Sequence, residues 1–169
     1  RYRIDGIMHE VMKFSKASIM SVPSSLGEFP PALMIVDPGS LVSSVLLQKL
    51  SDSRPWSVTI SNSVDEALKR VSAQNIFAIA YVHDHSRFSS LQSIDLLKQI
   101  KVHGQWPIIL LTHSPHEIAK QAINDIQVSY LLEWPVDSKK IETCLEQSFL
   151  RYQGRQNRDC LLRKKNLEN

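Results

Sequence analysis

The sequence is poor in cysteine and in long apolar segments, and each shortage excludes a class of protein. Its two cysteines, Cys144 and Cys160, are too few for a disulfide framework or a cysteine-based zinc module, so a reducing, cytoplasmic setting is expected. No apolar run approaches the roughly 20 residues that a transmembrane helix needs. Apolar residues nevertheless make up 43% of the chain and charged residues 22%, which is typical of a globular protein and excludes wholesale disorder.

Charge is unevenly distributed along the 169 residues, whose net charge is +3. Residues 151–169 hold six basic and two acidic residues, a balance of +4, so residues 1–150 carry about −1. The body of the protein is therefore not a basic nucleic-acid surface, and we expect no nucleic-acid contact by this domain. A basic tail is most often a solvated helix; a nucleic-acid contact or the start of a further domain are the alternatives.

Three segments follow from the pattern along the chain. Residues 1–16 place Ile4, Met8 and Val11 on one stripe of an amphipathic helix, and a stretch rich in proline, glycine and serine follows it. We therefore predict an N-terminal helix and linker over residues 1–30 and a domain over 31–150. Residues 151–169 then form a basic helical linker towards a possible output domain.

From Ala32 onward, short apolar runs alternate with amphipathic segments. The runs predict five strands, at residues 32–36, 58–60, 76–82, 107–112 and 128–132. A helix is predicted after each strand, with Ser63 as the N-cap of the second helix and Asp137 as that of the last. This alternation favours right-handed βαβ crossovers and a parallel sheet covered on both faces. Ligands and chemistry in such sheets lie at the carboxyl ends of the strands.

The strand ends resemble those of a known family. The relevant segments are Leu-Met-Ile-Val-Asp at 33–37, Pro-Ile-Ile-Leu-Leu-Thr at 107–112 and Leu-Leu-Glu-Trp-Pro-Val-Asp at 131–137. In their order and spacing, residues 32–150 resemble the receiver domain of bacterial two-component response regulators, in a degenerate, pseudo-receiver-like form. The resemblance implies a (βα)5 flavodoxin-like α/β fold with a five-stranded parallel sheet of order 2-1-3-4-5, here with an N-terminal helix and an extended C-terminal helix.

The resemblance also implies a phosphoryl-transfer site, of which this chain keeps only part. In the family, two acids after the first strand and an aspartate after the third bind a divalent cation, and that aspartate accepts the phosphoryl group. Asp37 matches the first acid, but Pro38 stands at the second and cannot ligate a metal. Thr112 matches the hydroxyl residue of the fourth strand. Trp134 replaces the lysine of the fifth strand and carries no charge.

The phosphoacceptor position is itself ambiguous. It falls on His83 when counted from the third strand and on His85 when counted back from the third helix, with Asp84 between them. Strand alternation would place both histidines on one face and Asp84 on the other. Either histidine would remove the nucleophilic carboxylate, whereas Asp84 would retain it.

Each of these residues also has a purely structural interpretation. Asp37 is either a residual cation ligand or, as we favour, a polar strand end that caps the next helix. Thr112 is expected to cap the helix after its strand, and Trp134 to plug the old pocket. Four imidazoles could meet at one rim as a metal site, but loop histidines are common without a ligand and no metal is expected. These four are His83, His85, His113 and His116.

Our leading hypothesis is a non-enzymatic, cofactor-free signalling module. It acts by protein–protein contact, as a homodimer paired through the fourth helix, fifth strand and fifth helix, or docked to a partner or its own output domain. The alternative is a functional phosphoacceptor that uses Asp84 with magnesium held by Asp37, and controls a DNA-binding or second-messenger output domain. An unrelated flavodoxin-like enzyme is disfavoured, because Gly39 is the one glycine in the loop after the first strand.

Overall fold

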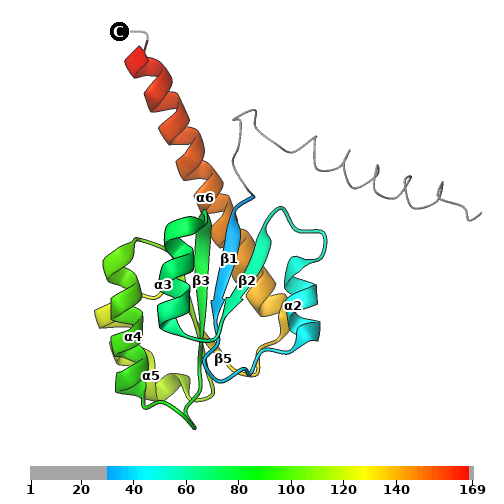
Figure 1. Cartoon of the computed structure of the whole chain (residues 1–169), viewed down its shortest axis with the longest axis vertical. Coiled ribbons are helices and arrows are strands. Elements are labelled where there is room, and N and C mark those ends of the chain that lie inside the picture. The colour runs from blue at the N-terminus through cyan, green and yellow to red at the C-terminus, as the bar shows by residue number, and fades with distance from the viewer. Residues whose placement is uncertain (1–29, 168–169) are drawn as a thin grey trace, which may run out of the picture.

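The computed structural model describes residues 30–167, which form one parallel five-stranded sheet with helices on both sides (Figure 1). The sheet order is β2-β1-β3-β4-β5, as the sequence predicts. The strands are β1 (Ala32–Val36), β2 (Ser57–Ser61), β3 (Ile76–His83), β4 (Ile108–Thr112) and β5 (Tyr130–Glu133). The helices are α2 (Ser44–Ser51), α3 (Val64–Ala73), α4 (Ser90–His103), α5 (Pro115–Gln121), the π-helical turn η1 (Ala122–Ile126) and α6 (Ser138–Leu167). The amphipathic helix predicted over 1–16 lies outside the described residues.

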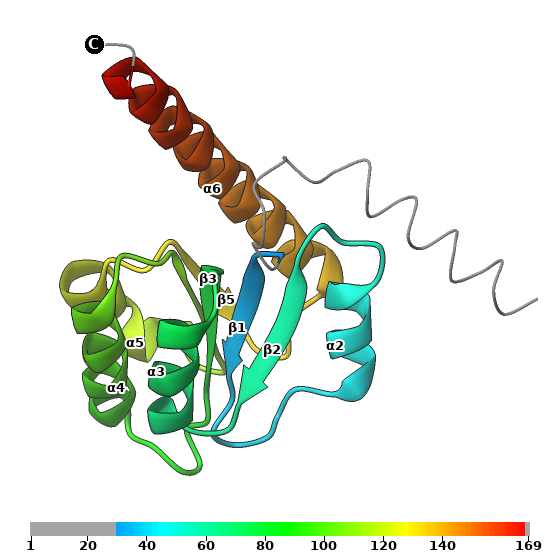
Figure 2. The ribbon, with the colours of Figure 1, turned by 45° about the horizontal axis from the view of Figure 1, so that its top comes forward.

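Two separate apolar layers hold the helices to the sheet. Alternate residues of each strand point to opposite faces, so Met34 and Val36 of β1 join one layer while Leu33 and Ile35 join the other. The first layer packs beneath α3, α4, α5 and η1, and the second beneath α2 and α6. The two groups of helices are seen on opposite sides of the sheet in Figure 2. All positions of β1, β3 and β4 are buried, which explains their uninterrupted apolar runs.

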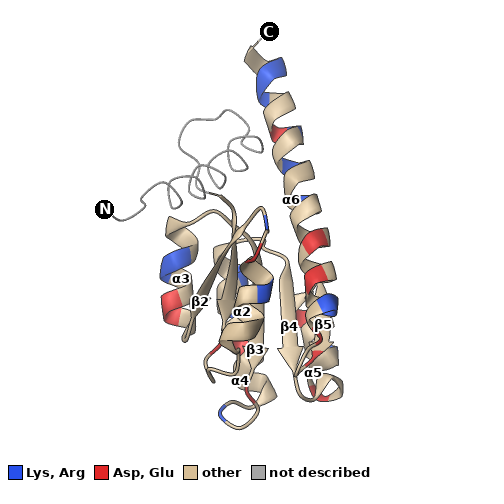
Figure 3. Ribbon diagram, turned by 90° about the vertical axis from the view of Figure 1, so that its right-hand side faces the viewer, with Lys and Arg blue, Asp and Glu red and all other residues tan. Residues whose placement is uncertain are grey.

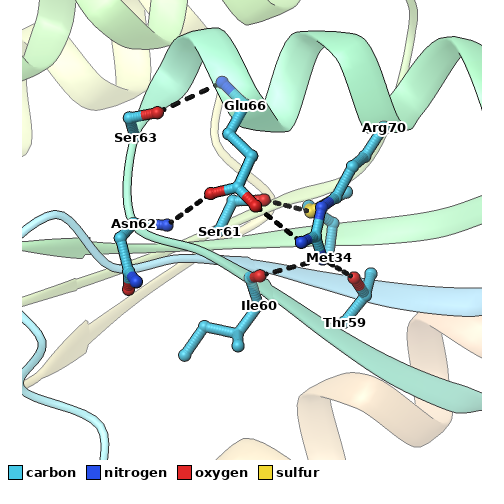
Figure 4. Close-up of polar contacts among 8 residues, drawn as sticks. All are labelled: Met34, Thr59, Ile60, Ser61, Asn62, Ser63, Glu66 and Arg70. Carbon is cyan, nitrogen blue, oxygen red and sulfur yellow. Dashed lines mark hydrogen bonds and ion pairs between the residues drawn. The ribbon is translucent and has the colours of Figure 1, made fainter.

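Helix α3 shows how local signals fix one element. Its N-cap is Ser63, as predicted, and the Ser63 hydroxyl accepts a hydrogen bond from the Glu66 amide at 3.1 Å. Arg70 donates to the Thr59 hydroxyl at 2.7 Å and to the Ile60 carbonyl at 3.0 Å, while it pairs with Glu66 one turn earlier (Figure 4). The cap and the arginine together fasten α3 to the edge strand β2.

The observed strand bounds lie within one residue of the predicted ones, except at the start of β5. The helix after β1 begins only at Ser44, because the Leu41 amide donates to a side chain of the preceding loop. Strand β5 begins at Tyr130 and not at Val128, because the Val128 amide closes the η1 turn on the Ala122 carbonyl at 3.1 Å. The helix predicted after the fourth strand begins at Pro115 and ends in the π-helical turn.

Only the first half of the last helix packs against the sheet. Ile141, Cys144, Leu145, Ser148 and Phe149 are buried against the sheet, as the apolar pattern predicts. Helix α6 continues through Gly154 to Leu167, and every residue from 153 to 167 is exposed. This half projects away from the domain in Figure 1. Over residues 30–167, none of the helices has the length and apolarity that crossing a bilayer would require.

Candidate functional site

The candidate site lies where β1, β3 and β4 end at one edge of the sheet. In the strand register His83 stands opposite Thr112, and Thr112 stands opposite Glu133. His83 is therefore the last residue of β3 and the direct neighbour of the hydroxyl residue of β4. Asp84 and His85 follow in the loop to α4, and Asp37 follows β1.

Asp37 is committed to the loop that follows its own strand. One carboxylate oxygen accepts the Leu41 amide at 3.0 Å and the other accepts the Val42 amide at 2.8 Å. The N-cap of α2 is Ser43, whose hydroxyl accepts the Leu46 amide, so the expectation that Asp37 caps the helix itself is wrong. The carboxylate instead supports the turn that leads into the helix, where two amides would otherwise lack partners.

Asp84 is buried and held by its own loop. One carboxylate oxygen accepts both the Ser86 amide at 3.0 Å and the Ser86 hydroxyl at 2.6 Å. These hydrogen bonds, the hydroxyl one first, together with nearby Arg87, hold the pKa of Asp84 below its usual range in spite of burial. Asp84 is thus an ionised, structurally bound carboxylate at neutral pH.

A second contact joins this loop to the loop after β1. The Asp84 carboxylate packs against Gly39 so closely that a Cβ at that position would overlap it. Arg87 also donates to the Pro38 carbonyl at 3.0 Å. The β1–α2 and β3–α4 loops are therefore closed onto each other, and we call this contact of Pro38, Gly39, Asp84 and Arg87 the loop latch.

His83 turns away from the two aspartates and lies beneath α4. Its Nδ1 is 2.6 Å from the Ser93 hydroxyl, a buried hydrogen bond in which the histidine tautomer decides the donor. The Tyr81 hydroxyl lies 3.3 Å from the same Ser93 oxygen. Burial lowers the pKa of His83, and the nearby His85 lowers it further, so the ring is neutral at pH 7. A neutral imidazole bonded to a buried serine serves as packing and is not a free nucleophile.

Thr112 and Trp134 also make local contacts. The N-cap position of α5 is Ser114, so the expectation that Thr112 caps this helix is wrong. The buried Thr112 hydroxyl instead accepts the Ser114 amide at 3.3 Å, at the start of the loop into α5. Trp134 is half-buried, donates its backbone amide to the Thr112 carbonyl at 2.8 Å, and packs its ring against the layer under α2 and α6. Its ring lines a groove of about 500 Å³ together with Leu41 and Leu46 of the α2 side.

The remaining histidines come together only in part. The rings of His85 and His113 meet edge to face with their centroids 4.9 Å apart, and His113 Nδ1 is buried without a hydrogen-bond partner in the described chain. His116 lies exposed in the first turn of α5. Across residues 30–167, no three His, Cys, Asp or Glu side chains are grouped so that they could hold a metal ion.

The donor set does not fit a magnesium ion of the kind the family uses. Magnesium requires near-octahedral oxygen ligands at about 2.1 Å, usually from carboxylates and waters. Both oxygens of Asp37 already accept loop amides, and one oxygen of Asp84 accepts two hydrogen bonds from Ser86. Pro38 offers a carbonyl that is bonded to Arg87. We therefore derive no step through a metal at this edge.

Three residues important to this geometry, Ser93, Gly39 and Arg87, have no such role in the sequence prediction. Ser93 is the buried partner of His83, and its signal was available: it occupies the apolar stripe of α4 with Leu97 and Ile100. Gly39 and Arg87 form the loop latch across 45 or more residues of chain, and no local pattern announces such a contact.

Comparison with solved structures identifies the fold. No family model and no curated protein matches the chain. A solved signal receiver domain of an HD domain-containing protein from Pseudomonas fluorescens Pf-5 is 20% identical, with a TM-score of 0.60 over 75% of this chain and 99% of that one. A two-component response regulator from Clostridium difficile is 14% identical, with a TM-score of 0.60 over 72% of this chain and 98% of that one. This chain has the receiver fold.

A further solved structure resembles this receiver fold over more of its length. An adenylate cyclase from Rhodopirellula baltica is 18% identical, with a TM-score of 0.65 over 80% of this chain and 99% of that chain. Identities this low establish the fold alone. The prediction of the (βα)5 receiver architecture is confirmed, and the role of each residue at the strand ends has to be argued from the chemistry above.

Proposed function

We propose that this chain is a receiver-fold signalling module that works by protein–protein contact, without catalysis and without conventional aspartyl phosphorylation. The observation that carries the proposal is His83. At the end of β3, beside Thr112, at the position that counting from the third strand gives to the acceptor carboxylate, stands a buried neutral imidazole bonded to Ser93. An imidazole in this state offers no acyl-phosphate chemistry.

Charge around the strand ends supports the same proposal. A phosphorylated carboxylate concentrates negative charge that the family offsets with a cation and a lysine. Here Pro38 replaces one cation ligand and the apolar ring of Trp134 replaces the lysine. The loop latch also covers Asp84, so an incoming phosphoryl group would have to displace Gly39 and break the Ser86 hydrogen bonds. Burying an unpaired anion there would cost several kcal/mol.

The decisive experiment offers the protein a phosphoryl donor. The purified chain is incubated with acetyl phosphate and magnesium, and separately with beryllofluoride, beside a response regulator that has the complete acidic set. We expect no adduct by intact mass and no magnesium-dependent amide shifts near Asp84, while the reference protein reacts. An adduct that is lost in Asp84→Ala but kept in Asp95→Ala would overturn the proposal and establish the alternative, a phosphoacceptor at Asp84.

Partner contact requires a surface, and the domain offers two. Large exposed apolar residues lie on α4, at Leu91 and Val102, and on η1, at Ile123. Ile123 belongs to the predicted pairing face, whose fourth helix corresponds to α5 and η1. Helix α6 exposes Leu150 and, in its projecting half, Leu161, and the two side chains fall on one side of the helix. An isolated helical segment of about 15 residues is marginal in water, so pairing would stabilise it.

The homodimer expected from the sequence is tested by sedimentation. We expect a dimer at tens of micromolar for the full chain, and a monomer when the chain is cut after Tyr152. A full chain that sediments as a clean monomer at that concentration would overturn self-association. The identity of an output domain and the cytoplasmic setting stay predictions.

A further inference from the structure

The end of the sheet opposite the loop latch carries an open groove that the proposed function does not use. It lies between the C-terminal end of α4, the start of β4 and the projecting helix α6, and has a volume of about 450 Å³. Its principal lining residues are Lys101, Trp106, Ser129, Arg151, Arg155 and Arg158. The volume falls within the range of small-ligand sites, about 300–1,000 Å³.

The groove is strongly cationic and its charges are uncompensated. Arg151, Arg155 and Arg158 are spaced i, i+4 and i+7, so they share one face of α6 along about 10 Å of its axis. Lys101 faces them from α4. None of these four cations forms an ion pair with another residue of the described segment 30–167. Figure 3 shows the basic residues on the projecting half of α6. Like charges at this spacing repel, so an anion from outside would relieve the repulsion.

Gly154 is one of the residues that line the groove, and Gly104 contacts Trp106 of its wall. Gly154 lies mid-helix among the three arginines, where glycine is unfavourable, yet nothing lies within 4 Å of where its Cβ would be. Gly104 lies under the six-membered ring of Trp106, and a side chain there would overlap that ring. The glycine therefore lets the half-buried indole lie flat against the end of α4, as part of the groove wall.

Neither residues 1–29 nor a second copy of α6 suits this cationic groove as a ligand. Residues 1–29 carry four basic and three acidic residues, so they have no net negative charge to offer. A second copy would present the same arginines and be repelled, so this face of α6 is unsuited to pairing with itself. Guanidinium groups bind phosphate oxygens in bidentate fashion, and an indole face stacks on a planar base. One aromatic wall beside a short ladder of arginines matches one base followed by several phosphates.

We propose that this groove binds a nucleotide carrying two or three phosphates, with the phosphates on Arg151, Arg155 and Arg158 and the base against Trp106. Lys101 adds charge on the opposite wall. The proposal does not depend on the proposed function, since it concerns the other end of the sheet and a different ligand chemistry. A ligand bound there would contact α6 at the point where it leaves the domain.

The test measures binding of ATP to the full chain by titration calorimetry and amide NMR at low salt without magnesium. We expect saturable binding, weaker binding of tripolyphosphate and of adenosine alone, and shifts at residues 101–107 and 151–158. Arg155→Ala with Arg158→Ala should weaken ATP binding by roughly tenfold or more. The matched control Arg163→Ala removes a cation from another side of the same helix and should leave binding within about twofold.

A tryptophan variant separates the two halves of the ligand. Trp106→Leu should weaken ATP binding while it leaves tripolyphosphate binding unchanged, with circular dichroism confirming the fold of every variant. Equal binding of ATP and tripolyphosphate would overturn the role of the base. Tighter binding of a single-stranded oligonucleotide or of a polyglutamate peptide than of ATP would overturn the nucleotide as occupant. Absence of any binding at millimolar ATP would overturn the site itself.

Discussion

The two ends of the sheet treat charged side chains in opposite ways. At the carboxyl ends, Asp37 and Asp84 are buried and both accept hydrogen bonds from their own loops, and Arg87 closes one loop onto the other. At the amino ends, Arg151, Arg155 and Arg158 stand open, without ion pairs inside the described chain, whereas Arg54 pairs with Glu142 and Glu146 of α6. The aspartates, whose hydrogen bonds are made within the protein, stabilise the loops. The arginines, whose charge is not paired, can attract an anionic partner.

The amino ends are also where α6 is anchored before it leaves the domain. The rings of Trp56, Phe77 and Phe149 meet with centroids 5.1–5.3 Å apart, and Asn75 bonds the hydroxyl of Tyr152. Aromatic contacts of this kind bury much apolar area and add directional attraction. These contacts fasten α6 to the sheet as far as Tyr152, directly before the point where its exposed, projecting half begins.

Truncating that anchor should give the largest effect. Phe149→Ala removes a side chain that is 7% exposed and in contact with two other rings, and we expect a loss of about 3–5 kcal/mol in unfolding free energy. The neighbouring Leu150 is 65% exposed, so Leu150→Ala should cost no more than about 0.5 kcal/mol. Urea unfolding of both variants measures the difference. Equal losses would show that α6 is not anchored by this cluster.

An intermediate effect is expected at the carboxyl end. Asp37→Ala leaves the Leu41 and Val42 amides without their acceptor, which should cost about 1–3 kcal/mol and loosen the β1–α2 loop. Urea unfolding measures the loss of stability, and hydrogen exchange of the Leu41 and Val42 amides measures the loosening of the loop. Asp95→Ala, at an exposed position of α4, is the control and should change stability little. If Asp37→Ala is as stable as the control, the carboxylate is free for another role.

Sequence patterns predict the two apolar layers well because a layer is a local, periodic property. The continuous runs at 32–36 and 76–82 are typical of strands buried on both faces, and the alternation of elements then leaves few topologies. The Ser63 cap and the buried face of α6 follow from the same periodic reasoning. The prediction of sheet order rests on the resemblance, since periodicity alone does not order strands.

The polar contacts between the loops at the carboxyl ends of the strands are harder to predict from the sequence. Two loops far apart in the chain meet at Gly39 and Arg87, and their contact depends on backbone paths that no spacing records. The cationic groove at the amino ends of the strands could be predicted in part, because the sequence shows the excess of positive charge in residues 151–169. The sequence does not show that the fold brings Lys101 and Trp106 to the same groove.

The smallest expected loss of stability concerns His83, the buried histidine at the carboxyl end of β3. Ser93→Ala removes the hydroxyl that lies 2.6 Å from Nδ1, and we expect a loss of about 1 kcal/mol at pH 8, because the buried ring nitrogen is left unpaired. Tyr81→Phe is the matched control, since it removes the other hydroxyl near Ser93 and leaves the histidine bond in place. Urea unfolding compares the two, and a larger loss in Tyr81→Phe would assign the stabilisation to the tyrosine instead.

The same histidine should make stability depend on pH in a defined direction. Burial lowers the pKa of His83 in the folded protein, with His85 and His113 acting in the same sense and Asp84 and Glu117 opposing. Between the folded pKa and the unfolded value near 6.5, the unfolded chain binds more protons, so stability is present above about pH 6.5 and declines as pH falls below it. His83→Gln should flatten this part of the profile, whereas His85→Gln, at an exposed position, should leave most of it. An unchanged slope in His83→Gln would mean that the ring titrates as freely in the fold as in the unfolded chain, and that its bond to Ser93 does not hold it neutral.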